Sequence, residues 1–161
     1  MMKVIDNFLR QYQFNQLQSL ILGYEFDWYF NNGVSTEDDG SYQFIHLFYN
    51  NRPRLAPTPT IVWLDPYLPF FNMKKIYRIK ANLSPRTVFH RKADYHVDNC
   101  QCSTTAIFYV NTCNGWTEFK KGGKVKSVAN RVVIFDPTLE HRGVTCTDEK
   151  RRVVMNFNYD V

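Results

Sequence analysis

The sequence predicts a mainly β protein of the α+β class, a β-sandwich or jelly roll with N-terminal helices packed on one sheet. From Ile76 onward, short segments rich in β-branched and aromatic residues alternate with turn residues, which is typical of strands and hairpins. Before them, residues 3–23 carry apolar side chains spaced three and four apart, as in an amphipathic helix. A chain of 161 residues with 13 Phe and 10 Tyr suits one domain with a sizeable core.

The first half of the chain combines helices with a few strands. The helical spacing ends near Gly23, a residue type that commonly follows a helix. Three prolines between residues 52 and 59 exclude a central strand there. We therefore expect one or two helices over 3–23, strands near 26–30 and 42–49, a connection over 52–59, and a short helix over 61–71 interrupted near Pro66 and Pro69.

The second half predicts strands throughout. Asn114-Gly115 and Gly122-Gly123 supply the positive-φ residues that tight hairpins require. The expected strands are 76–81, 87–89, 95–98, 104–111, 117–119, 125–127, 132–135, 143–145 and 152–159. Without a repeat or a visible boundary, residues 1–161 are expected to form a single domain, with helices and flanking strands in 1–75 and the β core in 76–161.

Composition narrows the classes of function. The net charge of +5 permits nucleic-acid binding, but the Lys and Arg residues are scattered, which favours ordinary surface charge. No apolar run approaches the roughly 20 residues that span a bilayer, and the N-terminus lacks the apolar core of a secretory signal. We therefore expect a cytoplasmic protein without a membrane partner, whose four cysteines are reduced thiols.

The candidate metal ligands are His96, Asp98 and His141. In a strand over 95–98, residues two apart point to the same face, so His96 and Asp98 present an imidazole and a carboxylate side by side. His141 follows the strand 132–135 and a short loop, which places it at the start of another strand. Two histidines and one carboxylate on one face of an octahedral metal leave three open positions, which suits iron(II) and oxygen chemistry. A structural zinc site would close all four positions.

The other residues of metal-binding type receive a structural interpretation, because His-x-Asp alone is a weak signal. His46 lies in an aromatic strand, and His90 has no carboxylate two residues later. Cys100 and Cys102 have no matching pair elsewhere, so we interpret them as ordinary thiols of a loop.

Seven segments carry a resemblance to a known family. They are, in chain order, Arg78–Leu83, His96–Asp98, Thr105–Asn111, Asn114–Phe119, Asn130–Asp136, His141–Gly143 and Arg152–Tyr159. Together they resemble the 2-oxoglutarate- and iron(II)-dependent oxygenases, in particular small phage-encoded members of the prolyl 4-hydroxylase-like branch. Val4–Leu9 is similar to the N-terminal opening of the same members.

This resemblance implies a double-stranded β-helix, a cupin-like jelly roll, that binds Fe(II) through His96, Asp98 and His141. It also implies that 2-oxoglutarate is the co-substrate, that O2 is the oxidant, that succinate and carbon dioxide are released, and that ascorbate serves as reductant. A phage-encoded member would work in the cytoplasm of the host cell.

The distal carboxylate of 2-oxoglutarate needs a cation, and the family places a basic residue at the start of the final strand. Arg151 and Arg152 both lie near that point. An arginine supplies a planar, permanently charged fork that suits a carboxylate. Strand parity favours Arg152, because the residues that would point inward with it are Val154, Asn156 and Asn158, which leaves Val153, Met155, Phe157 and Tyr159 to pack against the helices.

The resemblance implies that the Tyr109 hydroxyl donates a hydrogen bond to the same distal carboxylate. Further candidates for the pocket are Arg78, Asn82, Asn156 and Thr117. Arg131 is expected to anchor the structure instead of contributing to the chemistry.

The first expected substrate is a prolyl residue of a peptide or protein, hydroxylated at a C–H bond, with a small molecule as a further type of substrate. Oxidative demethylation of nucleic acid with the same cofactors is an alternative, although no basic groove interleaved with aromatic residues is apparent. Two other classes are carried as alternatives: a non-catalytic jelly-roll binding or virion protein, and a metal enzyme indifferent to 2-oxoglutarate. The sequence does not specify an oligomeric state.

Overall fold

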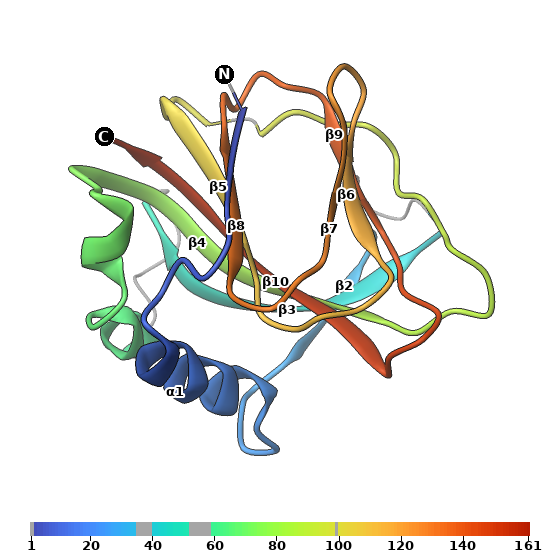
Figure 1. Ribbon diagram of the computed structural model, residues 1–161, viewed down its shortest axis with the longest axis horizontal. Coiled ribbons are helices and arrows are strands. Elements are labelled where there is room, and N and C mark those ends of the chain that lie inside the picture. The colour runs from blue at the N-terminus through green and yellow to red at the C-terminus, as the bar shows by residue number, and fades with distance from the viewer. Residues whose placement is uncertain (1, 35–39, 52–58, 99) are drawn as a thin grey trace.

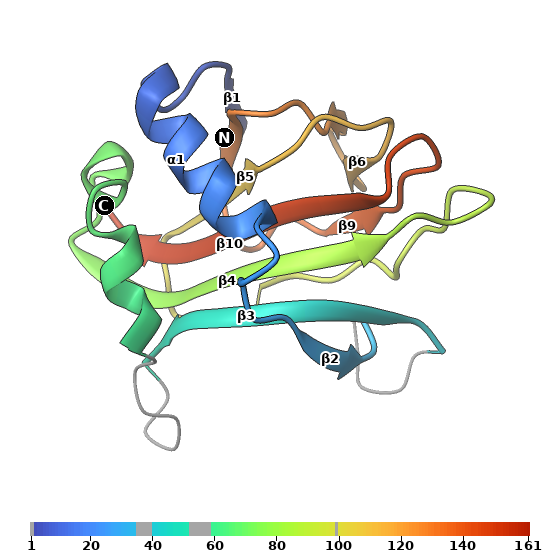
Figure 2. The ribbon, with the colours of Figure 1, turned by 90° about the horizontal axis from the view of Figure 1, so that it is seen from below.

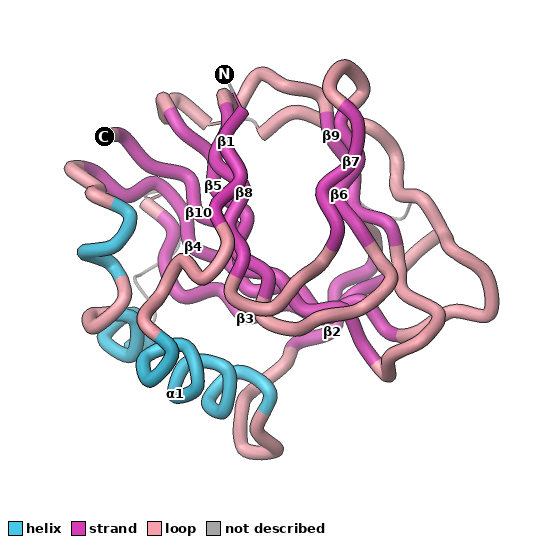
Figure 3. Tube along the Cα trace, in the orientation of Figure 1, coloured by secondary structure: helices cyan, strands magenta, loops and turns pink. Residues whose placement is uncertain are grey.

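Two β-sheets face each other in the computed structural model, which describes residues 2–34, 40–51, 59–98 and 100–161 (Figures 1 and 3). Within these residues the larger sheet has seven antiparallel strands in the order β1-β8-β5-β10-β4-β3-β2, and the smaller sheet has the order β7-β6-β9. The strands are β1 (Met2–Ile5), β2 (Tyr29–Asn32), β3 (Tyr42–Asn50), β4 (Lys75–Pro85), β5 (Thr104–Tyr109), β6 (Trp116–Phe119), β7 (Gly123–Lys126), β8 (Arg131–Phe135), β9 (His141–Val144) and β10 (Arg151–Asp160).

The second half of the chain alternates between the two sheets. β5 belongs to the larger sheet, β6 and β7 to the smaller one, β8 to the larger, β9 to the smaller and β10 to the larger. This repeated crossing between facing antiparallel sheets is the arrangement of a jelly roll. The predicted fold class, mainly β with a jelly-roll core, is confirmed.

Helices cover the outer face of the larger sheet (Figure 2). The helix α1 (Gln11–Leu22) buries Phe14, Leu17 and Ile21, whose spacing of three and four puts them on one side of the helix. Two short 3₁₀ helices, η1 (Pro59–Leu64) and η2 (Leu68–Phe71), replace the interrupted helix expected over 61–71. Their apolar residues share one core with the outward face of the sheet, so helices pack on one sheet as predicted.

Strand parity divides each central strand between two environments. On β10, Val153, Met155, Phe157 and Tyr159 belong to the core beneath the helices, whereas Arg152, Val154 and Asn156 line a cavity between the sheets. A second apolar cluster fills the neighbouring space between the sheets, with Tyr109 and Phe135 from the larger sheet and Phe119 from the smaller one.

Three expected elements are wrong in detail. Residues 3–5 were expected to be helical but belong to β1, which pairs with β8 and so gains backbone hydrogen bonds that an isolated helical turn would lack. Segments 87–89 and 95–98 form no regular strand; only an isolated bridge joins His96 to His141. The positive-φ prediction holds for Gly122 and Gly123 but not for Gly115. The connection expected over 52–59 lies almost entirely outside the described residues.

The cysteines differ from the expectation of four reduced thiols. Cys100 and Cys102 form a disulfide, because the loop brings their Cα atoms to 5.1 Å, closer than the spacing of alternate residues in a strand. Cys113 and Cys146 are free and buried. Within the described part of the chain, no helix combines the length and apolar character needed to cross a membrane.

Candidate active site

A cavity of about 420 Å³ opens between the two sheets. Its walls include alternate residues of β4 and β10 from the larger sheet, and Thr117 and Gly143 from β6 and β9 of the smaller sheet. All three candidate metal ligands also line it. The alternate residues of β4 and β10 that point between the sheets therefore bring polar side chains together in this cavity.

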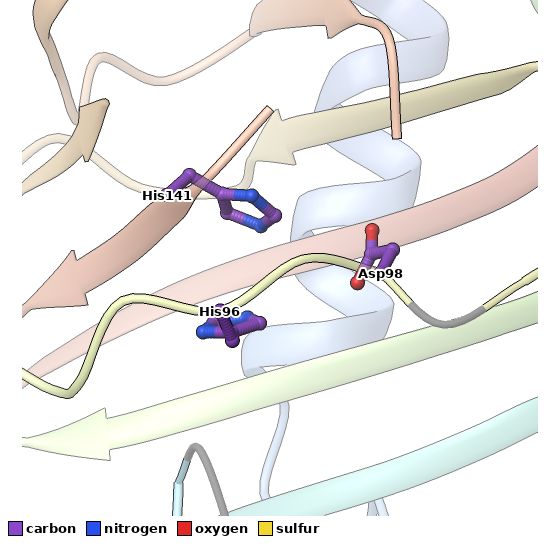
Figure 4. Close-up of side chains that lie close together, drawn as sticks. All are labelled: His96, Asp98 and His141. Carbon is purple, nitrogen blue, oxygen red and sulfur yellow. The ribbon is translucent and has the colours of Figure 1, made fainter. Parts of the chain in front are cut away.

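The side chains of His96, Asp98 and His141 gather around one point (Figure 4). One potential ligand atom from each lies within 4.8 Å of those of the other two. His141 begins β9, as predicted, and the backbone of His96 pairs with it through hydrogen bonds of 3.0 and 2.9 Å. Asp98 follows in the same loop, where its backbone N–H bonds the Pro137 carbonyl. A single bridge, not a strand, brings the three residues together.

In both histidines the Nδ1 atom faces a backbone carbonyl oxygen, which leaves Nε2 as the nitrogen available to a metal. The Nδ1 atom of His96 lies 3.2 Å from the Asp94 carbonyl oxygen, and that of His141 lies 2.9 Å from the Leu139 carbonyl oxygen. Because a carbonyl oxygen only accepts, each Nδ1 carries the hydrogen and each Nε2 keeps its lone pair. Metal-binding histidines are commonly oriented in this way.

Asp98 is held as a carboxylate by three donors. Thr105 Oγ1 and Asn158 Nδ2 each donate to its Oδ2 atom at 2.9 Å, and Arg78 pairs with its Oδ1 atom at 3.3 Å. Burial raises the pKa of the Asp98 carboxyl, but the charges of Arg78 and His141 and these hydrogen bonds outweigh it, so the pKa is lowered. Burial also lowers the pKa of His141, which favours the neutral imidazole. An ionised Asp98 carboxylate and a neutral His141 imidazole are the forms of these side chains that bind a metal.

Arg152 is a buried cation without a carboxylate partner among the described residues. Its side chain is 4 % exposed. Its Nε donates to Ser127 Oγ at 2.8 Å and its Nη2 to Thr117 Oγ1 at 3.0 Å, both neutral hydroxyls. Burial lowers the pKa of the guanidinium, as expected for a charge removed from water without a counterion. Such a group calls for an anionic ligand.

Tyr109, predicted to donate a hydrogen bond to the same carboxylate, lies against this arginine. Its ring lies under the Arg152 guanidinium at 5.7 Å, and its hydroxyl donates to Thr117 Oγ1 at 2.9 Å. Tyr109 is fully buried and is not among the described residues that line the cavity, whereas Thr117 is. Since Thr117 Oγ1 accepts from both Tyr109 and Arg152, its own hydrogen is left to donate into the cavity.

Gly115 makes room for Arg152. A Cβ atom on Gly115 would lie 2.7 Å from Arg152 Cδ and 2.8 Å from the Val144 carbonyl oxygen, so only glycine fits there. Gly115 is required because Arg152 and the backbone of Val144 approach it closely, and not because it forms a hairpin turn. A Cβ atom on Gly143 would lie 3.6 Å from Arg152 Nη1, next to the cavity.

Two other arginines have structural contacts. Arg151, the alternative anchor, points to the helical side and donates from Nη2 to the Leu22 carbonyl oxygen at 2.6 Å, at the C-terminal end of α1. Arg131 forms a two-bond pair with Asp6, as its anchoring role predicts. Neither is among the described residues that line the cavity.

The floor of the cavity also carries Arg78, Lys80, Asn82 and Asn156. Three of these were predicted; Lys80 was not, although the parity of Arg78 and Asn82 already places it on the same face. Thr105 and Asn158 were also missed as partners of Asp98. Their inward parity was readable from the sequence, but the loop that brings Asp98 to them was not.

The comparisons with known proteins point to one fold. No family model matches the chain, and the curated proteins contain no match to its sequence. Solved structures do match over nearly the whole chain. A 2OG-Fe(II) oxygenase family oxidoreductase from Burkholderia pseudomallei gives a TM-score of 0.70 at 12% identity, covering 98% of this chain and 84% of that one.

Two further solved structures agree. A prolyl-4-hydroxylase from Pseudomonas putida gives a TM-score of 0.68 at 13% identity, covering 99% of this chain and 92% of that one. SnoK, a non-heme alpha ketoglutarate dependent carbocyclase of nogalamycin biosynthesis, gives 0.68 at 12% identity, covering 98% and 78%. The chain therefore has the double-stranded β-helix fold that these 2-oxoglutarate- and iron(II)-dependent oxygenases share.

Proposed function

We propose that this protein is a 2-oxoglutarate- and Fe(II)-dependent dioxygenase that hydroxylates a C–H bond. The observation that carries the proposal is one cavity that contains both a His-Asp-His cluster and a buried arginine that has no counterion where the chain is described. The cluster suits an octahedral metal with open positions, and the arginine suits the far carboxylate of a dicarboxylic acid. The fold, shared with known 2-oxoglutarate oxygenases, supports this combination.

The three ligand residues would hold the metal with Nε2 of His96 and His141 and one oxygen of Asp98. A bound ferrous ion supplies the oxygen chemistry that couples decarboxylation of 2-oxoglutarate to substrate hydroxylation. The chain keeps both histidines in the correct tautomer through backbone carbonyls, and it keeps Asp98 ionised through Thr105 and Asn158.

Arg152 and Thr117 would hold the distal carboxylate of 2-oxoglutarate. Gly143 lies beside the Arg152 guanidinium, and His141 is two residues away on the same face of β9, about 7 Å by the rise of a strand. A five-carbon dicarboxylate suits that span. Tyr109 acts through Thr117, by orienting the hydroxyl that donates to the carboxylate.

A prolyl residue of a peptide or protein is the first candidate substrate. Prolyl hydroxylases are among the proteins that share the fold. A second hollow of about 360 Å³, lined by apolar side chains such as Val88 and Phe89, meets the catalytic cavity at Ser84 and Gly143. This hollow offers a place for the chain that flanks a target residue.

The proposal is tested by binding and by turnover. Mn(II) and the 2-oxoglutarate analogue N-oxalylglycine should together raise the melting temperature of the wild-type protein, and neither should do so for Asp98→Ala. Arg152→Met should retain the response to Mn(II) and lose the response to N-oxalylglycine. Arg131→Met, which removes an arginine that already has an aspartate partner, is the matched control and should respond as the wild type does.

Turnover is measured as succinate released from 2-oxoglutarate with Fe(II), ascorbate and oxygen. The wild type should form succinate slowly without a substrate, because uncoupled turnover needs only the co-substrate, and Asp98→Ala should form none. A wild-type protein that binds Mn(II) but is indifferent to N-oxalylglycine and to 2-oxoglutarate would contradict the proposal and favour a metal enzyme of another kind.

A further inference from the structure

Lys80 is a third cation on the cavity wall, and neither the metal cluster nor the co-substrate pocket accounts for it. It lies on β4 between Arg78 and Asn82, whose side chains share its face. Across the sheet it is opposite Asn156 of β10 on one side and Leu47 of β3 on the other. Its side chain is partly buried.

Within the described residues, the ammonium group of Lys80 forms no hydrogen bond and no ion pair. Asp98, the only acidic residue among the described residues of the cavity wall, is already held by Arg78, Thr105 and Asn158. The wall thus carries three cations and one carboxylate. A divalent metal and dianionic 2-oxoglutarate would cancel each other, so the excess of positive charge would persist.

Two amide oxygens beside Lys80 also have no hydrogen-bond partner among the described residues. Asn82 is 7 % exposed, and its Oδ1 atom has no hydrogen bond; the Oδ1 atom of Asn156 is buried and unbonded in the same way. A buried acceptor without a donor is destabilising, so both oxygens call for an N–H or O–H group from a ligand. The cluster therefore combines a cation with two acceptors.

The position of this cluster separates it from the proposed 2-oxoglutarate anchor. Ser84 is the β4 residue opposite Arg152. Lys80 lies four residues from Ser84 on the same strand, and the rise of a strand puts the two about 13 Å apart along β4. The hydroxyls that accept hydrogen bonds from Arg152 belong to Thr117 of β6 and to Ser127, which follows β7, whereas Lys80 has β3 beside it. The co-substrate and this cluster thus occupy different parts of the cavity.

We propose that Lys80 binds a carboxylate of the primary substrate, while Asn82 and Asn156 accept hydrogen bonds from an N–H or O–H group beside that carboxylate. The substrate is then a free or chain-terminal amino or hydroxy acid. This inference rests on the proposed function, because the metal and 2-oxoglutarate must fill the rest of the cavity.

The experiment measures binding near the metal. The protein is loaded with Mn(II) and N-oxalylglycine, and the paramagnetic relaxation of added compounds is followed by proton NMR. Three acid and amide pairs serve as probes: L-proline with L-prolinamide, L-leucine with L-leucinamide, and N-acetyl-L-alanine with N-acetyl-L-alaninamide. In at least one pair the acid should bind about tenfold more tightly than its amide, as expected for loss of a charged hydrogen bond.

Three variants complete the test. Lys80→Met should abolish the preference for the acid, Lys80→Arg should keep most of it, and Lys121→Met, at an exposed lysine of the β6–β7 turn, should leave it unchanged. All three should bind N-oxalylglycine with wild-type affinity. The inference is overturned if every amide binds as well as its acid, or if Lys80→Met weakens N-oxalylglycine about tenfold, which would assign Lys80 to the co-substrate. Failure of the wild type to bind Mn(II) and N-oxalylglycine at all would instead contradict the proposed function.

Discussion

The two faces of the larger sheet are built from alternate residues of the same strands, yet they have opposite chemistry. On the helical face, Phe157 stacks on Phe71 with ring centroids 4.2 Å apart, and its neighbours on that face are apolar and buried. On the cavity face, Arg152 and Lys80 have no counterion within the described part of the chain, and the Oδ1 atom of Asn156 has no hydrogen bond there. The first face is arranged for stability, whereas the second presents charged and polar groups that a ligand can pair with.

The largest expected effect is a loss of stability from the helical face. Phe157→Ala removes a 2 % exposed ring from the core and should lower the free energy of unfolding by about 3–5 kcal/mol. Asn156→Ala, its neighbour on the opposite face, should change that free energy by less than about 1 kcal/mol, because it removes an unsatisfied acceptor. Urea unfolding of the metal-free proteins measures both. Equal losses would show that the two faces do not differ as argued.

The next substitution should raise the free energy of unfolding instead of lowering it. Arg152→Met should leave the metal-free protein as stable as the wild type or more stable by up to about 2 kcal/mol, because a buried charge without a counterion is removed. The affinity for 2-oxoglutarate should fall about 100-fold, since truncating one partner of a buried charge pair costs roughly 2–5 kcal/mol. Denaturation and calorimetric titration in the presence of Mn(II) measure the two quantities. A loss of stability above about 2 kcal/mol would make Arg152 a structural residue.

These contrasts also show how far sequence reasoning reaches. The alternation along residues 152–159 predicts which side chains face the helices and which face the cavity, because a strand has a period of two residues. The position of His141 at the start of a strand follows from the length of the preceding loop in the same way. Local periodicity is sufficient where the element is regular and one face is buried.

Local periodicity does not predict which distant strands pair or how loops are arranged. The apolar residues of 2–5 fit a helix as well as a strand, and their partner β8 lies some 130 residues later in the register Met2↔Phe135. The segment around His96 is held by isolated bridges and single backbone hydrogen bonds, so no periodicity predicts that Asp98 reaches Thr105 and Asn158. The disulfide of Cys100 and Cys102 depends on the same loop geometry.

A third prediction concerns the pH dependence of stability through Lys80. Burial, followed by the charge of Arg78, lowers the pKa of Lys80 from 10.5 to about 8, with Asp98 opposing the shift. Between these values the unfolded chain binds more protons than the native one, so the stability of the wild type rises with pH from about 8 to 10.5. Lys80→Met should therefore be more stable than the wild type by up to about 3 kcal/mol at pH 7, and this difference should shrink toward pH 10.5.

Lys121→Met provides the control for that measurement, because it removes a lysine that is exposed. Its stability relative to the wild type should be independent of pH over the same range. A difference between Lys80→Met and the wild type that stays constant from pH 7 to 10.5 would mean that the ammonium group of Lys80 is well solvated in the native protein.

The smallest expected effect tests how the cavity face is organised around Asp98. Thr105→Val keeps the shape of a fully buried side chain and removes one of the donors to Asp98 Oδ2, while Asn158 still donates to the same atom. The carboxyl then becomes easier to protonate, and the affinity for Mn(II) should fall about tenfold, as for other groups that orient a metal ligand. Thr104→Val, the preceding residue on the other face of β5, should bind Mn(II) as the wild type does. A Thr105→Val protein that binds Mn(II) as tightly as the wild type would assign Thr105 to packing and not to the orientation of Asp98.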